Sequence, residues 1–138
     1  MKKPIFTWDA ESGETLCVIN DKEKVYYGIA KCHPEDMDMK SEKTGCFIAE
    51  ERAKIMMLSH KRDELKIELK ALKRYYASIS QSKYFDETSY PIRRLLDHMS
   101  RIETDITDIK ELLQYEKKIL NTYISEKEKL YERIRRNR

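Results

Sequence analysis

The chain has 138 residues, of which 38% are charged and 40% hydrophobic, and it contains only 3 Gly and 3 Pro. This length fits one small module with an extension, and this composition is typical of long charged helices. It excludes, to a first approximation, the folds that bind dinucleotides or nucleoside triphosphates through glycine-rich loops. The net charge of +3 is too small to make nucleic-acid binding the default. The first fifty residues carry a net negative charge, and the remaining residues carry a net positive charge.

Three short apolar stretches near the N-terminus are separated by turn signals, and they predict antiparallel strands. They comprise residues 5–8, 15–19 and 25–30 and are rich in β-branched and aromatic side chains. Ser12 and Gly13 supply the first turn, and Asn20-Asp21 supplies the second. Pro34 ends the third strand, because proline cannot donate to a ladder of hydrogen bonds.

From about residue 45 the apolar residues follow a heptad spacing, which predicts two long helices. The first covers about residues 45–79, with Ser41 or Thr44 as its N-cap. A polar connector ends at Pro91, which suits the first turn of a second helix over about residues 91–136. We therefore expect an α+β protein: a three-stranded antiparallel β module over residues 1–44, followed by a coiled-coil hairpin of two long helices over residues 45–138.

The second helix carries an apolar seam that is longer than the first helix can cover. About 10–15 residues at its C-terminal end need cover from the β module or from another chain. We therefore expect a homodimer through this helix. The seam residues expected to form it are Ile106, Ile109, Leu113, Leu120, Tyr123, Leu130 and Ile134. Because Glu116 interrupts the seam, the alternative is that the helix breaks near Tyr115 and folds back within the monomer.

No set of residues has the spacing of a catalytic site. The hydroxyl and thiol side chains lack a strand-turn-helix elbow, and the three histidines follow no triad order. A zinc site would need Cys17, Cys32, His33 and Cys46. These residues lack a C-x-x-C pair, so we expect no metal. Since no catalytic spacing is present either, we expect no other cofactor and no enzyme activity. Without a signal peptide or an apolar membrane span, we expect a cytoplasmic protein with reduced thiols.

Aromatic and basic side chains are the candidates for contact with a partner or ligand. Tyr26 and Tyr27 are neighbours on one strand, so one of them faces inward. The guanidinium of Arg52 could clamp a ligand near the sheet edge. Basic residues at the end of the second helix could bind phosphates or could complement the helix dipole. The candidates are Trp8, Tyr26, Tyr27, Lys31, Arg52, Arg135 and Arg136.

One family resemblance rests on residues 28–36, which read G-I-A-K-C-H-P-E-D, and residues 45–53, which read G-C-F-I-A-E-E-R-A. The pattern resembles small uncharacterised bacterial and phage-borne proteins with a strand ending in G-A-K-C-x-P-x-D before a helix opening G-x-x-I-A-x-x-R-A. Some of these are similar to part of the double-stranded-RNA-binding fold, a β-hairpin packed on a helix. The likeness covers about residues 15–55, and the long heptad helices depart from the compact members. It implies a non-enzymatic binder of prophage type.

We therefore expect a non-enzymatic interaction protein that contacts a protein partner. The resemblance implies a phage or prophage accessory factor that binds and inhibits a host macromolecule, such as a defence-system protein, in the host cytoplasm. Two alternatives stay open: a nucleic-acid or nucleotide-binding module that uses the β face and basic helix residues, and a structural dimerisation rod. A nucleic-acid binder is expected to lose affinity steeply as salt is added.

Overall fold

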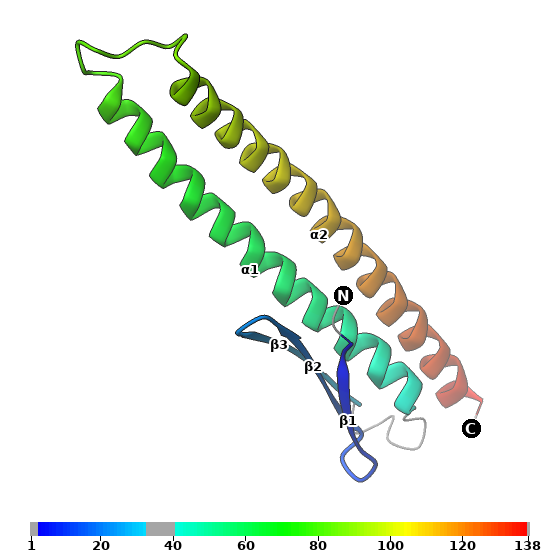
Figure 1. Ribbon diagram of the computed structural model, residues 1–138. Coiled ribbons are helices and arrows are strands. Elements are labelled where there is room, and N and C mark those ends of the chain that lie inside the picture. The colour runs from blue at the N-terminus through cyan, green and yellow to red at the C-terminus, as the bar shows by residue number, and fades with distance from the viewer. Residues whose placement is uncertain (1–2, 33–40, 138) are drawn as a thin grey trace. The chain divides into compact units, whose positions relative to one another are not determined.

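The computed structural model describes residues 3–32 and 41–137 (Figure 1). Its elements in chain order are β1 (Ile5–Asp9), β2 (Glu14–Asp21), β3 (Lys24–Lys31), α1 (Glu42–Ile79) and α2 (Tyr90–Arg136). The three strands form one antiparallel sheet in the order β1-β2-β3. The predicted α+β class, a three-stranded antiparallel sheet followed by two long helices, is confirmed. The predicted coiled-coil packing of the helices stays a prediction.

Two tight connections join the strands. In the first, the Gly13 N–H donates to the Asp9 carbonyl at 2.8 Å, and Gly13 has a φ of 70° that favours glycine. For the second, the sequence predicts a turn that begins with Asn20-Asp21 and has Lys22, Glu23 and Lys24 at its tip, and the observed turn lies at this tip. Asp21 pairs with Lys24 across the ladder, so the turn lies at residues 22–23, where Lys22 has a φ of 59°. The opposite charges of this last pair extend the hairpin beyond the residues that favour turns.

One face of the sheet, the inner face, packs on the first turns of α1. The buried cluster consists of Cys17, Ile19, Tyr26, Ala30, Ala49 and Ala53. Its closest approach is at Gly28, where a Cβ atom would overlap the Ala49 carbonyl oxygen and lie 2.6 Å from the Ala53 nitrogen. The backbone of α1 therefore rests directly on β3, and small residues on both elements make that contact possible.

Helix α1 begins three residues earlier than predicted because Ser41 caps it. The Ser41 Oγ accepts from the Thr44 N–H at 3.3 Å, and its carbonyl accepts from the Gly45 N–H at 2.9 Å. Of the two predicted caps, Ser41 is the one observed. Thr44 lies within the first turn, where it is half-buried.

Gly45 makes a second close contact between α1 and the sheet. A Cβ atom at Gly45 would overlap the Thr15 Oγ1 and lie 3.2 Å from the Thr15 Cβ. Thr15 is fully buried, and its hydroxyl has no hydrogen-bond partner among the described residues. The Thr15 hydroxyl thus occupies the space that a larger residue at position 45 would need.

Gly45→Ala alone is expected to destabilise the protein by about 1–3 kcal/mol, because the new methyl group overpacks the contact. Adding Thr15→Ala is expected to recover most of that loss, since it removes the overlapping oxygen, and alanine is a better helix former than glycine by about 1 kcal/mol. Urea unfolding of the two single variants, the double variant and the unmodified protein measures this coupling. Simply additive losses would contradict the steric explanation.

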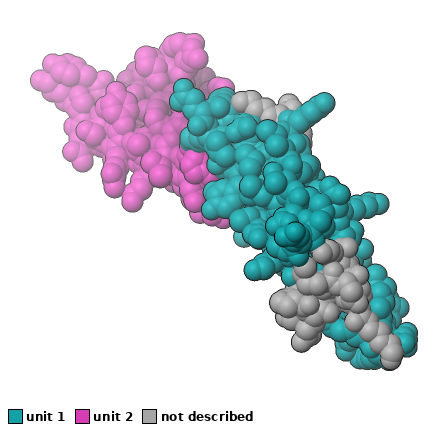
Figure 2. All heavy atoms as spheres, turned by 90° about the horizontal axis from the view of Figure 1, so that it is seen from below, with its two compact units in different colours: residues 1–58, 113–138 teal, residues 59–112 magenta. Residues whose placement is uncertain are grey.

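The chain divides into two compact units (Figure 2). Unit 1 comprises Met1–Leu58 and Leu113–Arg138, and unit 2 comprises Ser59–Leu112. Within unit 1, the rings of Phe47 on α1 and Tyr123 on α2 have centroids 4.2 Å apart. The boundary near residue 44 that the sequence predicts is therefore a change of secondary structure, whereas the compact unit joins the sheet to both helices.

Within unit 2, α1 and α2 are linked by exposed ion pairs over a buried apolar strip. Lys73 lies 3.6 Å from Glu103, and His98 lies 3.4 Å from Glu68. Exposed pairs of this kind contribute little to stability. The buried residues on the α2 side are Met99, Ile102 and Ile106.

Helix α2 is continuous from Tyr90 to Arg136, so the alternative of a break near Tyr115 is wrong. The seam is interrupted there by Glu116, but glutamate is a good helix former, and its side chain is half-buried beside Glu51 of α1. Among the described residues, neither helix has a stretch long and apolar enough to cross a membrane.

The seam of α2 is largely covered by the chain's own residues, which corrects the predicted homodimer surface. Within the single chain, Ile106 is 7%, Leu113 2% and Leu120 7% exposed. Ile109 and Tyr123 are half-buried. Only Leu130 and Ile134, at 38% and 39%, stay exposed. The prediction was wrong for the centre of the seam because α1 lies beside α2 in each unit and satisfies the apolar stripe.

Candidate functional site

The face of the sheet turned away from α1 carries an exposed apolar surface, here called the outer patch. Because side chains alternate along a strand, it is formed by the residues between those of the buried cluster. The register aligns them in rows across the three strands. The outer patch consists of Ile5, Leu16, Val18, Val25, Tyr27 and Ile29. Four of these are well exposed: Ile5 at 58%, Val25 at 56%, Tyr27 at 51% and Ile29 at 42%.

The charges on this face lie in one row beside the outer patch. Asp9 pairs with Glu14, and Glu14 pairs with Lys31, so the row contains two acidic side chains and one basic one. A surface that binds nucleic acid gains most of its affinity from cations that neutralise phosphates. The outer face supplies no excess of such cations. Lys31, a predicted contact residue, lies exposed at the end of this row.

The three aromatic candidates do not share a face. Tyr27 lies in the outer patch, whereas Tyr26 is 4% exposed and belongs to the buried cluster. Trp8 is half-buried on the inner face, with its ring 3.5 Å from a Cβ atom built on Gly45. Alternation correctly predicts that one of the two tyrosines faces inward. The stacking surface of several aromatic rings that single-strand binders use is not formed.

The free edge of β3 is covered by two side chains of α1. The Arg52 Nη1 donates to the Ile29 carbonyl at 2.6 Å, and the Tyr27 N–H donates to the Met56 Sδ at 3.4 Å. These contacts satisfy main-chain groups that point away from β2. Arg52 thus has a structural role at this edge, and its role as a ligand clamp stays a prediction.

The opposite edge, at β1, is left unpaired by the residues that the structure describes. The Cys32 N–H donates to the Gly13 carbonyl, which fixes the alternation of hydrogen-bonded pairs along β2 and hence along β1. By this alternation the N–H and C=O groups of Phe6 and Trp8 point away from β2. In the described part of the chain, no hydrogen bond reaches these groups. Phe6 itself is 39% exposed.

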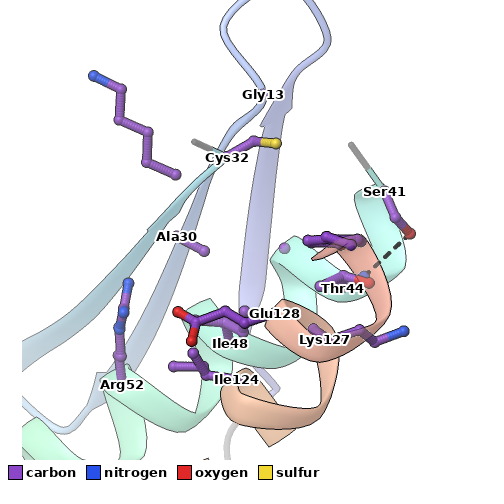
Figure 3. A pocket seen from close by; sticks show the side chains of 13 residues that line it. Gly13, Ala30, Cys32, Ser41, Thr44, Ile48, Arg52, Ile124, Lys127 and Glu128 are labelled. Carbon is purple, nitrogen blue, oxygen red and sulfur yellow. Dashed lines mark hydrogen bonds between the residues drawn. The ribbon is translucent and has the colours of Figure 1, made fainter. Parts of the chain in front are cut away.

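Unit 1 also contains a cavity of about 230 Å³ between the end of β3, the start of α1 and the last turns of α2 (Figure 3). Ile48 and Ile124 form its apolar part, and the charged side chains of Arg52, Lys127 and Glu128 lie around it. The volume is below the range of about 300–1,000 Å³ that small-molecule sites occupy. No histidine is among the described lining residues.

A buried acid lies where the two helices meet in unit 1. Glu51 is 7% exposed, its Oε1 lies 3.5 Å from the Lys54 Nζ, and no donor reaches its Oε2. Burial raises the pKa of Glu51 to about 7, and Glu116 adds to this by accepting a hydrogen bond from the protonated form and by charge repulsion. Glu51 is thus a titratable group in the packing of α1 on α2.

Two of the free thiols, Cys17 and Cys46, lie in an environment that disfavours the thiolate. Burial, followed by the charge of Glu50, raises the pKa of Cys17 to about 11, and burial also raises the pKa of Cys46. Thiols of this kind are weak nucleophiles and weak metal ligands at neutral pH. Within residues 3–32 and 41–137, no group of three or more His, Cys, Asp or Glu side chains could hold a metal ion. His33, the fourth residue that a zinc site would need, lies outside the described residues.

The basic residues at the end of α2 contact their own helix. The Arg136 Nη2 lies 2.6 Å from the Glu132 Oε1, one turn earlier. Arg135 is half-buried and also interacts within the chain. This end of α2 is remote in sequence from the β face, and no contact between the predicted arginines and Tyr27 is observed.

Two features of the site, the outer patch and the edge of β1, were not predicted from the sequence. The sequence of β2 nevertheless carries a signal for the outer patch. The run Leu16-Cys17-Val18-Ile19 is apolar at every position instead of at alternate ones. Such a run is typical of a strand covered on both faces. The open edge of β1, by contrast, depends on the strand order and on where α1 lies.

Comparison with known proteins adds no family to this description. The resemblance over residues 15–55 to phage-borne proteins and to part of the double-stranded-RNA-binding fold therefore stays a prediction. What the site can do is inferred from its own geometry. No protein family, curated protein or solved structure was found to match the chain.

Proposed function

We propose that the protein is a non-enzymatic protein-binding module whose contact surface is the outer patch. One observation carries the proposal: the sheet is apolar on both faces, and α1 covers only one of them. Removing apolar surface from water favours association by about 25 cal/mol for each Å² buried, before the entropy lost on binding is subtracted. A contiguous exposed apolar surface on one face of a small protein is typical of an interaction site.

The arrangement of side chains on this face also supports the proposal. Tyr27 lies in one row with Val18 and Ile5, and tyrosine is enriched among the residues that dominate binding energy. The charged row of Asp9, Glu14 and Lys31 borders the patch at one end. An apolar centre with a polar border is the usual anatomy of a protein interface.

The partner in this proposal is a host protein, such as a defence protein that the module blocks by occupying its surface. This part of the proposal is supported by the resemblance of residues 15–55 to phage-borne proteins. The acidic excess in the charged row favours a protein over a nucleic acid, because Lys31 is the one cation that the described strands place on the outer face.

Tyr27→Asp is expected to weaken binding of the partner at least tenfold, because it places a charge in the middle of an apolar contact. The matched control is Tyr75→Asp, since Tyr75 is a similarly exposed tyrosine, at 58%, on the part of α1 that lies in unit 2. Both variants and the unmodified chain are used to capture proteins from nuclease-treated bacterial lysate, and the captured protein is then purified for titration.

The proposal requires a protein that the unmodified chain and Tyr75→Asp retain and that Tyr27→Asp loses. Binding should also depend weakly on salt. A ligand that nuclease removes and whose affinity falls steeply with salt would contradict the proposal in favour of a nucleic-acid binder. Equal retention by all three proteins would show that the contact surface lies elsewhere.

A further inference from the structure

We propose that β1 is the docking edge for β1 of a second copy of this chain, so that two sheets join into one six-stranded antiparallel sheet. The two-fold axis of this dimer passes beside Thr7. The proposal concerns the edge of the sheet and not its outer face. It therefore stands or falls independently of whether the outer patch binds another protein.

The first argument is the difference between the two edges of the sheet. An unprotected edge strand is a template for pairing with another strand, and proteins usually cover such edges. Here Arg52 and Met56 satisfy outward groups of β3. Among the described residues nothing does the same for the outward N–H and C=O groups of Phe6 and Trp8. The described part of the chain thus protects the edge of β3 and leaves the edge of β1 available.

The second argument is that β1 is complementary to itself in one register. In an antiparallel pair centred on Thr7, Phe6 of each copy lies opposite Trp8 of the other. Both are residues whose main-chain groups point outward, so the two pairs exchange four hydrogen bonds. Shifting the centre to Phe6 places Pro4 opposite Trp8, and Pro4 has no N–H to donate. Of these two registers, the one centred on Thr7 satisfies every outward group of Phe6 and Trp8.

The third argument comes from the side chains that this register brings together. Thr7 is exposed on the outer face and lies opposite Thr7 of the second copy, and threonine pairs across strands are favourable. On the inner face, Phe6 lies opposite Trp8 of the second copy, which forms an aromatic cross-strand pair. The 39% of Phe6 that is exposed in the single chain is then available for burial.

The test uses charge at the two-fold axis. Thr7→Lys and Thr7→Asp each place two like charges opposite one another in the dimer, so each variant alone is expected to dimerise about fivefold more weakly or worse. Mixing the two variants pairs opposite charges and is expected to restore association. Sedimentation equilibrium over a range of concentrations measures this. The control is Asn20→Lys, which adds a charge at an exposed position of β2 on the same face.

A dimer of the unmodified chain that is weakened by either Thr7 variant, restored by mixing them and unaffected by Asn20→Lys supports the proposal. Three results overturn it: a monomer at every concentration, a dimer indifferent to residue 7, or variants that do not associate when mixed. Tyr27→Asp, which removes the outer patch contact, is expected to leave the dimer intact. Loss of the dimer in Tyr27→Asp alone would mean that copies stack through the outer patch, which also overturns the proposal.

Discussion

Gly28→Ala is expected to destabilise the protein by about 3 kcal/mol or more, at the upper end of the range for overpacked sites. The new Cβ atom would meet the Ala49 carbonyl oxygen, the Ala53 nitrogen at 2.6 Å and the Arg52 Cβ at 2.8 Å. Two of these three are backbone atoms of α1, so no side-chain rotation relieves the overlap. Either α1 moves away from β3 and opens the buried cluster, or the sheet detaches.

Urea unfolding followed by circular dichroism measures this loss as a lower midpoint. The control is Ile29→Ala, the next residue of β3, whose side chain lies on the opposite face and is 42% exposed. It is expected to change the free energy of unfolding by less than about 1 kcal/mol. If Gly28→Ala matched this control, the close contact between α1 and β3 would not be what holds the sheet.

The local elements could be predicted from the sequence because their signals are local. Alternation and turn residues place the three strands, and the heptad spacing places both helices within about three residues of their observed ends. The second turn lies at its predicted tip but excludes the two residues that signalled it. Asn20 and Asp21 are turn formers, but the pairing of Asp21 with Lys24 keeps them in the ladder. Local preference was overridden there by a contact between two strands.

The candidate site could be predicted only in part, because it depends on which face α1 covers. Alternation says that Tyr26 and Tyr27 face opposite ways but not which of them is buried. That is decided by the contact of Gly28 with Ala49 and Ala53, which joins residues more than twenty positions apart. The same placement lets Arg52 reach the Ile29 carbonyl. Sequence reasoning that treats Arg52 as a ligand clamp cannot anticipate this partner.

The apolar seam of α2 is a second case in which the sequence does not identify the element that covers a surface. The apolar spacing is real, but it does not say whether the covering helix belongs to the same chain or to another. Leu113 and Leu120 are buried within the single chain, so the self-association proposed above is placed at β1 instead. The interruption of the seam at Glu116 is visible in the sequence. Only the structure shows that the Glu116 side chain interacts with the buried Glu51.

Glu51→Gln is expected to remove most of a loss of stability that the unmodified protein undergoes between about pH 4.5 and pH 7. In the folded protein, burial and Glu116 raise the pKa of Glu51 to about 7 from its ordinary value of 4.5. Across this interval the unfolded chain has released the proton while the folded chain still holds it. The folded state therefore binds more protons, and its stability falls as the pH rises.

The size of the effect follows from the shift in pKa, since each unit corresponds to about 1.4 kcal/mol. The free energy of unfolding is thus expected to be about 2–3 kcal/mol lower at pH 8 than at pH 4.5 through this group alone. A glutamine at this position stays neutral and can donate to the Glu116 carboxylate. At pH 8 the variant is expected to be more stable than the unmodified protein, and at pH 4.5 nearly equal to it.

Urea unfolding at half-unit pH steps from 4.5 to 8 measures both curves, and their difference isolates Glu51 from the other carboxylates. The control is Glu50→Gln, because Glu50 is the preceding residue, is only half-buried and pairs with the same Lys54 at 3.7 Å. That variant is expected to keep the fall in stability. A Glu51→Gln curve parallel to that of the unmodified protein would mean that Glu51 is ionised in the folded state, with Lys54 and water compensating its charge.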